Sequence, residues 1–418
     1  MIRIPGLELT DHTFTVPLDH SRDDGPAIEV FAREAVAAGR RREDLPWLLF
    51  LQGGPGGKSP RPVAADHWLG QAVKTHRVLL LDQRGTGRST PVTARTVAGM
   101  DTAELAAYLR HFRADSIVAD AEIIRERLGV PQWETLGQSY GGFVTLTYLS
   151  QAPQGLRVCY VTGGLPSLTA TIDELYARTY PRVAAKNAAY YRRYPGDAEA
   201  VRRIADHLDA EDVRLPDGDR LTTRRLRTLG IAFGMSDGHE QVHWMLDEAW
   251  HGDQLAEGFR HEVMAATGFV DKPIFSLQEF CYGRPGRASR WSADRALAQY
   301  SAFAADADPL LFTGEMMYRW MFDDIAALRP FAGAADLLAD AEDWPDLYDP
   351  EVLARNEVPV YAAVYFDDMY VDADLQLETA ARTGNVRTWV TNEYEHNGLR
   401  ASDGKVLARL MDMATGRA

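Results

Sequence analysis

Hydrophobic and polar positions follow two different patterns in the first part of the chain. Apolar and polar side chains alternate over residues 13–18 and again over residues 28–33, as in strands that expose one face to solvent. Residues 47–51 and 78–81 are instead uninterrupted apolar runs, which are typical of parallel strands covered by helices on both faces. We therefore expect an antiparallel pair that leads into a mainly parallel sheet.

Strand and helix patterns then alternate. Apolar residues recur at helical spacing over residues 116–130, and a short strand pattern follows at 133–136. Residues 143–149 read as a helix and residues 158–161 as a further strand. This alternation predicts an α/β fold class with a mainly parallel central sheet.

The pattern changes in the middle of the chain. Residues 171–329 show helical periodicity and almost no strand signal, whereas strand patterns return at 358–365 and 386–390. The simplest account is one α/β domain interrupted by a helical insertion of ordinary domain size. The α/β domain would comprise residues 1–166 and 345–418, and the helical cap domain residues 167–344.

Composition excludes several classes of protein. The 418 residues are 46% hydrophobic and 25% charged, as in ordinary globular proteins, and the formal charge is 45 − 60 = −15, which repels phosphate backbones. No apolar run approaches the ~18 residues of a membrane span, and the N-terminus has no apolar signal core. Cys159 and Cys281 are too few for a disulfide framework or a four-thiolate zinc site. We expect a cytoplasmic protein with no nucleic-acid or membrane partner.

Residues 137–141, Gly-Gln-Ser-Tyr-Gly, match the pattern G-x-S-x-G between a predicted strand and a predicted helix. In that setting a serine occupies a tight turn that holds its Oγ above the sheet edge, at a helix N-terminus that favours developing negative charge. Small flanking residues are needed because a Cβ there would clash with neighbouring backbone. The pattern predicts Ser139 as a nucleophile; an ordinary glycine-rich turn is the alternative.

A nucleophilic serine needs a base and an orienting acid, and on this type of fold they follow the serine in the order acid, then histidine. His396 follows the strand predicted at 386–390 and is the only histidine after residue 261, so we expect it to be the base. Asp368 is favoured as the acid because it lies close to the end of the strand before. Asp367 is the second choice, and two more aspartates compete less well, Asp372 and Asp374.

An oxyanion hole needs two backbone N–H donors. One is expected from Tyr140, the residue after the nucleophile, and the other from the glycine-rich turn at residues 52–57. Gly54 is the choice in that turn because Pro55 has no N–H to donate.

Three ordered motifs make a family resemblance visible. Residues 52–56 (QGGPG) resemble the HGGPG turn of proline iminopeptidases, residues 82–89 (DQRGTGRS) resemble their DQRGxGxS segment, and residues 137–142 resemble their nucleophile turn. Residues 393–398 are similar to the larger subtype of this family, the prolyl aminopeptidases of the α/β-hydrolase fold. Gln52 stands where many relatives carry histidine. The resemblance implies a serine peptidase that releases N-terminal proline from peptides through a prolyl-enzyme ester, with an inserted cap domain and without a metal or organic cofactor.

The resemblance also implies that glutamates of the cap bind the substrate ammonium. Glu279 and Glu315 both lie among apolar and aromatic residues, where an unpaired carboxylate is costly. Pairing with a nearby arginine is the alternative for either glutamate. Tyr140 and three aromatic residues of the middle segment, Phe280, Tyr282 and Trp320, could line the pocket of the proline ring, although such residues more often pack helices together.

Fold and triad do not fix the acyl substrate, so a carboxylesterase or thioesterase is the alternative function. A non-catalytic binding module of the same fold is a third possibility, which the apparent completeness of the triad disfavours. Asp82 and Arg84 are interpreted as loop-fixing residues.

Overall fold

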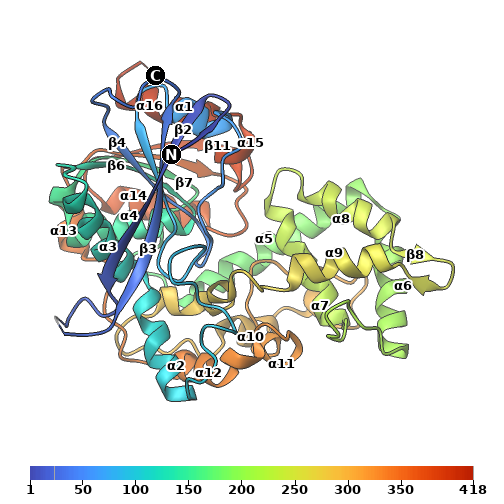
Figure 1. The fold of residues 1–418 in the computed structure, drawn as a ribbon. Coiled ribbons are helices and arrows are strands. Elements are labelled where there is room, and N and C mark those ends of the chain that lie inside the picture. The colour runs from blue at the N-terminus through green and yellow to red at the C-terminus, as the bar shows by residue number, and fades with distance from the viewer. Residues whose placement is uncertain (23, 418) are drawn as a thin grey trace.

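The computed structural model describes residues 1–22 and 24–417 of the chain. Ala418, the last residue of the predicted α/β domain, and Asp23 lie outside the described residues. A nine-stranded sheet forms one side of the molecule, and helices of the middle segment extend away from it (Figure 1). Its strand order is β1-β2-β3-β5-β4-β6-β7-β10-β11.

The first part of the sheet is antiparallel and the rest is parallel. The antiparallel strands are β1 (Ile2–Ile4), β2 (Leu7–Pro17) and β3 (Ala27–Ala37), and β3 also runs antiparallel to β5. The parallel strands are β4 (Trp47–Leu51), β5 (Arg77–Leu81), β6 (Trp133–Gln138), β7 (Leu156–Thr162), β10 (Val360–Tyr365) and β11 (Val386–Thr391). The predicted α/β class with a mainly parallel sheet is confirmed.

Both faces of the parallel strands are buried, which explains their uninterrupted apolar runs. Along β4, Leu48 and Phe50 belong to one hydrophobic cluster, and Leu49 and Leu51 belong to the other. Each such side chain contributes about 1.5–3 kcal/mol to folding when fully buried. One face is covered by α1 (His67–Ala72) and α16 (Lys405–Ala414); helices of the other face include α3 (Ala114–Arg127) and α4 (Tyr140–Gln151).

Strands from the two ends of the chain complete one sheet. β7 precedes the helical segment, β10 follows it, and the two strands pair directly in parallel. The remaining helices near the sheet are α2 (Thr102–Leu109), α13 (Pro350–Ala354), α14 (Ala373–Arg382) and α15 (Gly398–Ala401), with 3₁₀ turns η1 (Arg110–Phe112) and η2 (Pro153–Gly155). This topology fits an insertion, and the boundaries at 166/167 and 344/345 stay a prediction.

The middle segment begins with a long helix, α5 (Ile172–Arg193), which runs from the sheet toward the far helices (Figure 1). A capping box at Thr171 fixes its start. The α-helices after it are α6 (Asp197–Ala210), α7 (Thr223–Arg227), α8 (Gly238–Asp247), α9 (Glu257–Thr267), α10 (Ser292–Leu297), α11 (Met321–Asp324) and α12 (Ala332–Asp340). The 3₁₀ segments are η3 (Thr228–Gly234), η4 (Pro273–Tyr282), η5 (Ser301–Phe303) and η6 (Arg329–Phe331).

The segment is less regular than its periodicity predicts. A small antiparallel pair, β8 (Trp250–His251) and β9 (Gln254–Leu255), lies between α8 and α9, and η4 takes the place of an α-helix where the apolar spacing suggested one. Periodicity indicates which positions are buried and does not distinguish an α-helix from a 3₁₀ segment. η4 is packed among other elements, and nearly all of its residues are buried.

Candidate active site

Ser139 occupies the sharp turn between β6 and α4. Its backbone has φ 54° and ψ −123°, a conformation that a residue with a side chain adopts only under strain. The two glycines after Tyr140 permit the turn: a Cβ at Gly141 would lie 1.9 Å from the Leu51 carbonyl oxygen, and one at Gly142 would lie 2.2 Å from that of Gly164. The turn thus presents a partly exposed serine at the N-terminus of a buried helix.

The glycine-rich turn after β4 packs directly against this serine. A Cβ added to Gly53 would lie 2.9 Å from the Cβ of Ser139, so the backbone of the turn can approach only because that side chain is missing. Gly54 has φ +134°, which L side chains rarely adopt. Gln83 Nε2 donates a hydrogen bond of 3.0 Å to the Gln52 carbonyl oxygen, which links the turn to the loop after β5.

Asp82, next to Gln83, is fully buried and ties loops together. Its carboxylate accepts hydrogen bonds from the backbone N–H of Ser59 at 3.1 Å and of Arg88 at 2.9 Å, and from Arg61. These contacts stay away from the serine and agree with a structural role.

Asp368 and His396 come together from the loops after β10 and β11. His396 Nδ1 lies 2.6 Å from Asp368 Oδ2, and both side chains are buried. The other carboxylate oxygen of Asp368 accepts from the backbone N–H groups of Tyr370 at 2.8 Å and Val371 at 3.1 Å. Asp367, the second choice from the sequence, is exposed.

The charges around His396 favour its protonated form. Burial lowers the pKa of the imidazole, but the Asp368 carboxylate, assisted by Glu315 and Glu395, outweighs burial and raises that pKa above its ordinary value. The ring also meets the ring of Tyr370 edge-on, with centroids 4.7 Å apart. The His396 ring is therefore surrounded by carboxylates and packed against an aromatic ring.

Glu315 lines a cavity beside these residues. Its neighbours there include Phe143 of α4, Tyr282 of η4, Gln278 and Tyr370. Burial raises the pKa of the Glu315 carboxyl to about 7, and the proximity of His396 partly opposes that rise. Part of the side chain remains accessible, so the carboxylate is enclosed by protein and open to the cavity.

The segment that carries Glu315 is fixed to α5 and to η4. Asn187, fully buried on α5, accepts from the Phe312 N–H at 2.8 Å and donates to the Phe312 carbonyl oxygen at 2.9 Å. Gln278 Nε2 donates to the Glu315 carbonyl oxygen at 3.3 Å. The position of the carboxylate thus follows from backbone anchors on both sides.

Glu279 lies in a different setting. Its carboxylate accepts from the backbone N–H groups of Ser292 at 3.1 Å and Ala293 at 2.9 Å at the start of α10, and burial raises its pKa. It lines neighbouring cavities and is absent from the lining of the cavity that Glu315 faces. The structure therefore does not bring the two glutamates predicted from sequence to the same cavity.

The three predicted aromatic residues also separate. Tyr282 lines the cavity and meets Phe143 edge-on, with centroids 5.7 Å apart. Phe280 packs near Trp344, and Trp320 stacks on Tyr318 with centroids 5.9 Å apart; neither lines this cavity. Both rings pack against other aromatic residues, which is the alternative that the sequence left open, and their part in substrate binding stays untested.

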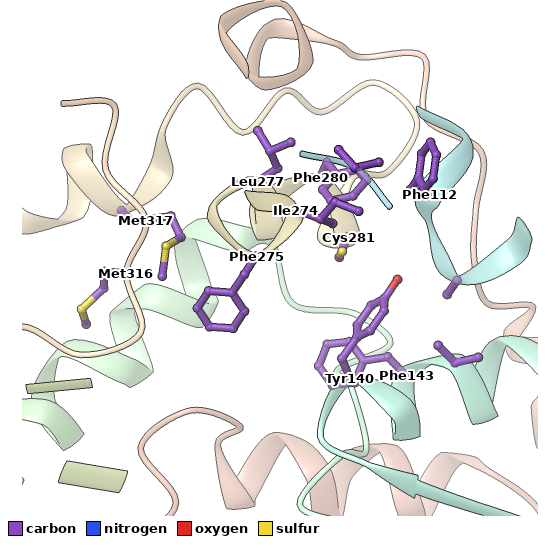
Figure 2. Packing of buried hydrophobic residues seen from close by; sticks show 14 of the residues in the cluster. Phe112, Tyr140, Phe143, Ile274, Phe275, Leu277, Phe280, Cys281, Met316 and Met317 are labelled. Atoms are coloured by element: carbon purple, nitrogen blue, oxygen red, sulfur yellow. The ribbon is translucent and has the colours of Figure 1, made fainter. Parts of the chain in front are cut away.

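α4 and η4, which both contribute residues to the lining of the cavity, also pack against each other. Figure 2 shows Tyr140 and Phe143 of α4 facing Ile274, Phe275 and Cys281 of η4. Tyr140, the residue after Ser139, therefore packs in the same apolar cluster as Tyr282. This cluster therefore joins the serine turn to the middle segment.

Sequence reasoning missed Tyr370 and Gln278. Tyr370 follows Asp368 by two positions, and its ring contacts His396, but no motif marks it. Gln278 adjoins Glu279, and only the fold shows which of the neighbours faces the cavity.

Within residues 1–22 and 24–417, no group of three or more histidine, cysteine, aspartate or glutamate side chains is arranged to hold a metal ion. Across the same part of the chain, none of the helices combines the length and the apolar character that a membrane span requires.

Comparisons with known proteins complete the description of the site. A family model described as alpha/beta hydrolase fold matches residues 46–211. A proline iminopeptidase of Aeromonas sobria is 47% identical over 98% of this chain and 97% of its own length. Proline iminopeptidase aneH of Aspergillus aculeatus is 34% identical over 97% of this chain and 93% of its own. A solved hydrolase structure from Rhodococcus sp. strain RHA1 aligns over 97% of this chain and 99% of its own, with 12% identity and a TM-score of 0.46.

Proposed function

The chain belongs to the proline iminopeptidase family of α/β-hydrolase enzymes, and on that premise we propose that it releases N-terminal proline from peptides with Ser139 as nucleophile. His396 is the proposed base, and Asp368 orients its imidazole. The bond between His396 Nδ1 and Asp368 supports these roles because it leaves Nε2 as the nitrogen that can take the serine proton.

The proposed reaction has two halves. Ser139 Oγ attacks the carbonyl carbon of the first residue while His396 accepts its proton, and the N–H groups of Gly54 and Tyr140 stabilise the oxyanion. Collapse of this intermediate breaks the peptide bond, and His396 gives its proton to the departing amine. Water, activated by the same imidazole, then hydrolyses the prolyl-enzyme ester and frees proline. Neither half requires a metal or an organic cofactor.

Glu315 carries the proposal of an aminopeptidase. A carboxylate enclosed in a cavity beside the catalytic histidine is costly unless a cation neutralises it, and the protonated amine of an N-terminal proline is such a cation. Among the described residues, no lysine or arginine lies within 4.0 Å of this carboxylate, whereas most buried carboxylates of the protein have an arginine or histidine partner. Tyr282 and Phe143 would flank the proline ring.

Residues 167–344 are proposed as a cap that limits substrates to free N-termini. Glu315 and Tyr282 both belong to this segment, and the cavity lies between them and the α4 helix of the sheet domain. A residue ahead of the proline would turn its charged amine into a neutral amide, so an extended substrate would lose the proposed ion pair with Glu315. Glu279 is proposed to support the cap from the start of α10 and not to contact substrate.

Three substrates test the proposal: a prolyl arylamide with a free amine, its N-acetylated form and a short-chain ester. We expect rapid hydrolysis of the free amide, none of the acetylated amide, and loss of activity in Ser139→Ala. Equal turnover of free and acetylated amides would contradict the aminopeptidase proposal and indicate an esterase or a general amidase. Full activity in Ser139→Ala would remove the site assignment.

A further inference from the structure

The loop that carries His396 is bonded to the middle segment at consecutive residues. The backbone N–H of His396 donates to the Gly234 carbonyl oxygen at 3.1 Å. Asn397 Oδ1 accepts two hydrogen bonds from one residue, at 3.0 Å from the Ser236 N–H and at 2.7 Å from its hydroxyl. The loop that carries the His396 imidazole is therefore hydrogen-bonded to residues at the end of η3 and just after it.

The long helix α5 holds both catalytic loops from the other side. Lys186 Nζ donates to Glu395 Oε1 at 2.5 Å, one residue before the histidine. One turn earlier, Arg182 Nε pairs with Asp372 Oδ2 at 2.6 Å, and its guanidinium also donates to the Phe366 carbonyl oxygen at 3.1 Å. Asp372 and Phe366 bracket the acid loop, so α5 is bonded to the loops of both triad partners.

Tyr370 links the same elements through its side chain. Its hydroxyl donates to the Ile231 carbonyl oxygen in η3, while its ring meets the ring of His396. The fit is close, because a Cβ at Gly234 would lie 2.2 Å from a carbon of the Tyr370 ring. The orientation of the imidazole is therefore limited on one face by a tyrosine that η3 holds.

We propose that residues 231–236 and α5 form a clamp that sets the position of the catalytic histidine, with Ser236, Asn397 and Tyr370 as positioning residues. The inference rests on the proposed function, because it takes His396 to be the base. Asp368 restrains only the Nδ1 edge of the ring; the backbone of residues 395–397 decides where Nε2 points relative to Ser139. A displacement of about 1 Å at a reacting atom can cost about a hundredfold in rate. The segment that encloses substrate is then the segment that completes the catalytic triad.

Variants of the Ser236–Asn397 contact test the clamp with a prolyl arylamide. Asn397→Ala removes the acceptor of both bonds, and we expect kcat to fall about tenfold to a hundredfold with KM within about twofold of the parent. Ser236→Ala keeps the backbone donor and should lose less, whereas Ser236→Thr, which retains the hydroxyl, should restore activity. Ser301→Ala on η5, an exposed serine of the same segment, is the matched control and should behave as the parent.

A second measurement distinguishes an effect on the position of His396 from a general weakening of the contact between the middle segment and the sheet. A fluorophosphonate reacts with Ser139 by forming a phosphonate ester and releasing fluoride, and the rate of this step depends on the base and not on amine recognition. The rate should therefore fall in parallel with kcat. If Asn397→Ala fails to fold, the Ser236 pair still decides the outcome. Parent kcat in Ser236→Ala and Asn397→Ala, or a rise in KM alone, would overturn the clamp. An active Ser139→Ala would instead overturn the proposed function itself.

Discussion

His396 Nδ1 lies 2.6 Å from Asp368 Oδ2, a carboxylate with no exposed surface whose other oxygen accepts two backbone N–H groups. The two backbone hydrogen bonds fix the orientation of the carboxylate toward the imidazole. The histidine therefore has one preferred tautomer, with its proton on Nδ1. The neighbouring Asp367 is exposed.

Asp368→Asn should therefore lower kcat by about 10⁴-fold, because an amide can present its NH₂ to Nδ1 and stabilise the wrong tautomer. KM for a prolyl arylamide should change little. Steady-state kinetics with active-site titration measure both constants. Asp367→Asn is the matched control one position away, and a larger loss of kcat in this control than in Asp368→Asn would transfer the acid role to Asp367.

Glu315→Gln should raise KM for free-amine substrates tenfold or more, which corresponds to about 1.4 kcal/mol of lost binding free energy. The amide keeps the size of the side chain but cannot neutralise an ammonium. Glu279→Gln is the comparison, because its carboxylate holds backbone N–H groups of α10. We expect Glu279→Gln to lower thermal stability and to leave KM nearly unchanged. A raised KM in Glu279→Gln with an unchanged KM in Glu315→Gln would assign amine recognition to Glu279.

The pH dependence of the kinetic constants should reflect the titration of both His396 and Glu315. The pKa of His396 is raised, so kcat/KM should fall on the acid side with an apparent pKa above about 6.5, the ordinary histidine value. Glu315 is among the charges that raise it, beside Asp368 and Glu395. Glu315→Gln should therefore move the acid limb to lower pH.

Amine binding has its own window of pH. Below about 7 the Glu315 carboxyl takes up a proton and loses its charge, and above about 8 an α-amino group is neutral. KM should be lowest between these values, and in Glu315→Gln its rise on the acid side should disappear. Michaelis constants measured from pH 5.5 to 9 at constant ionic strength give the profile; an unchanged acid side in the variant would contradict amine binding by Glu315.

The sequence predicted the sheet well because local patterns encode it. The apolar runs at β4 and β5 report burial on two faces, and the G-x-S-x-G pattern reports a backbone turn that few other residues can form. Both signals depend on neighbours in the chain. Ser139 and the loops that carry Asp368 and His396 could therefore be chosen as candidates without coordinates, and their catalytic roles stay a prediction.

The middle segment was harder to predict because its polar contacts join residues far apart in the chain. Glu279 and Glu315 have similar apolar surroundings in the sequence, yet one carboxylate meets the N–H groups of α10 and the other faces the cavity. That difference arises from how α5, η4 and α10 pack. Tyr370 is another case, because its contact with Ile231 spans elements far apart in the chain.

The nucleophile turn makes a sharp prediction about stability. Gly142→Ala would place a methyl group 2.2 Å from the Gly164 carbonyl oxygen, a backbone atom that cannot move without displacing the strand end that supports Ser139. We expect a loss of about 3 kcal/mol or more in unfolding free energy, or a failure to fold. Gly258→Ala in α9 is the control, since a Cβ there meets no atom within 4 Å and alanine stabilises a helix by about 0.5–1 kcal/mol. Urea unfolding of both variants measures the difference, and equal stabilities would show that the turn can relax around a side chain.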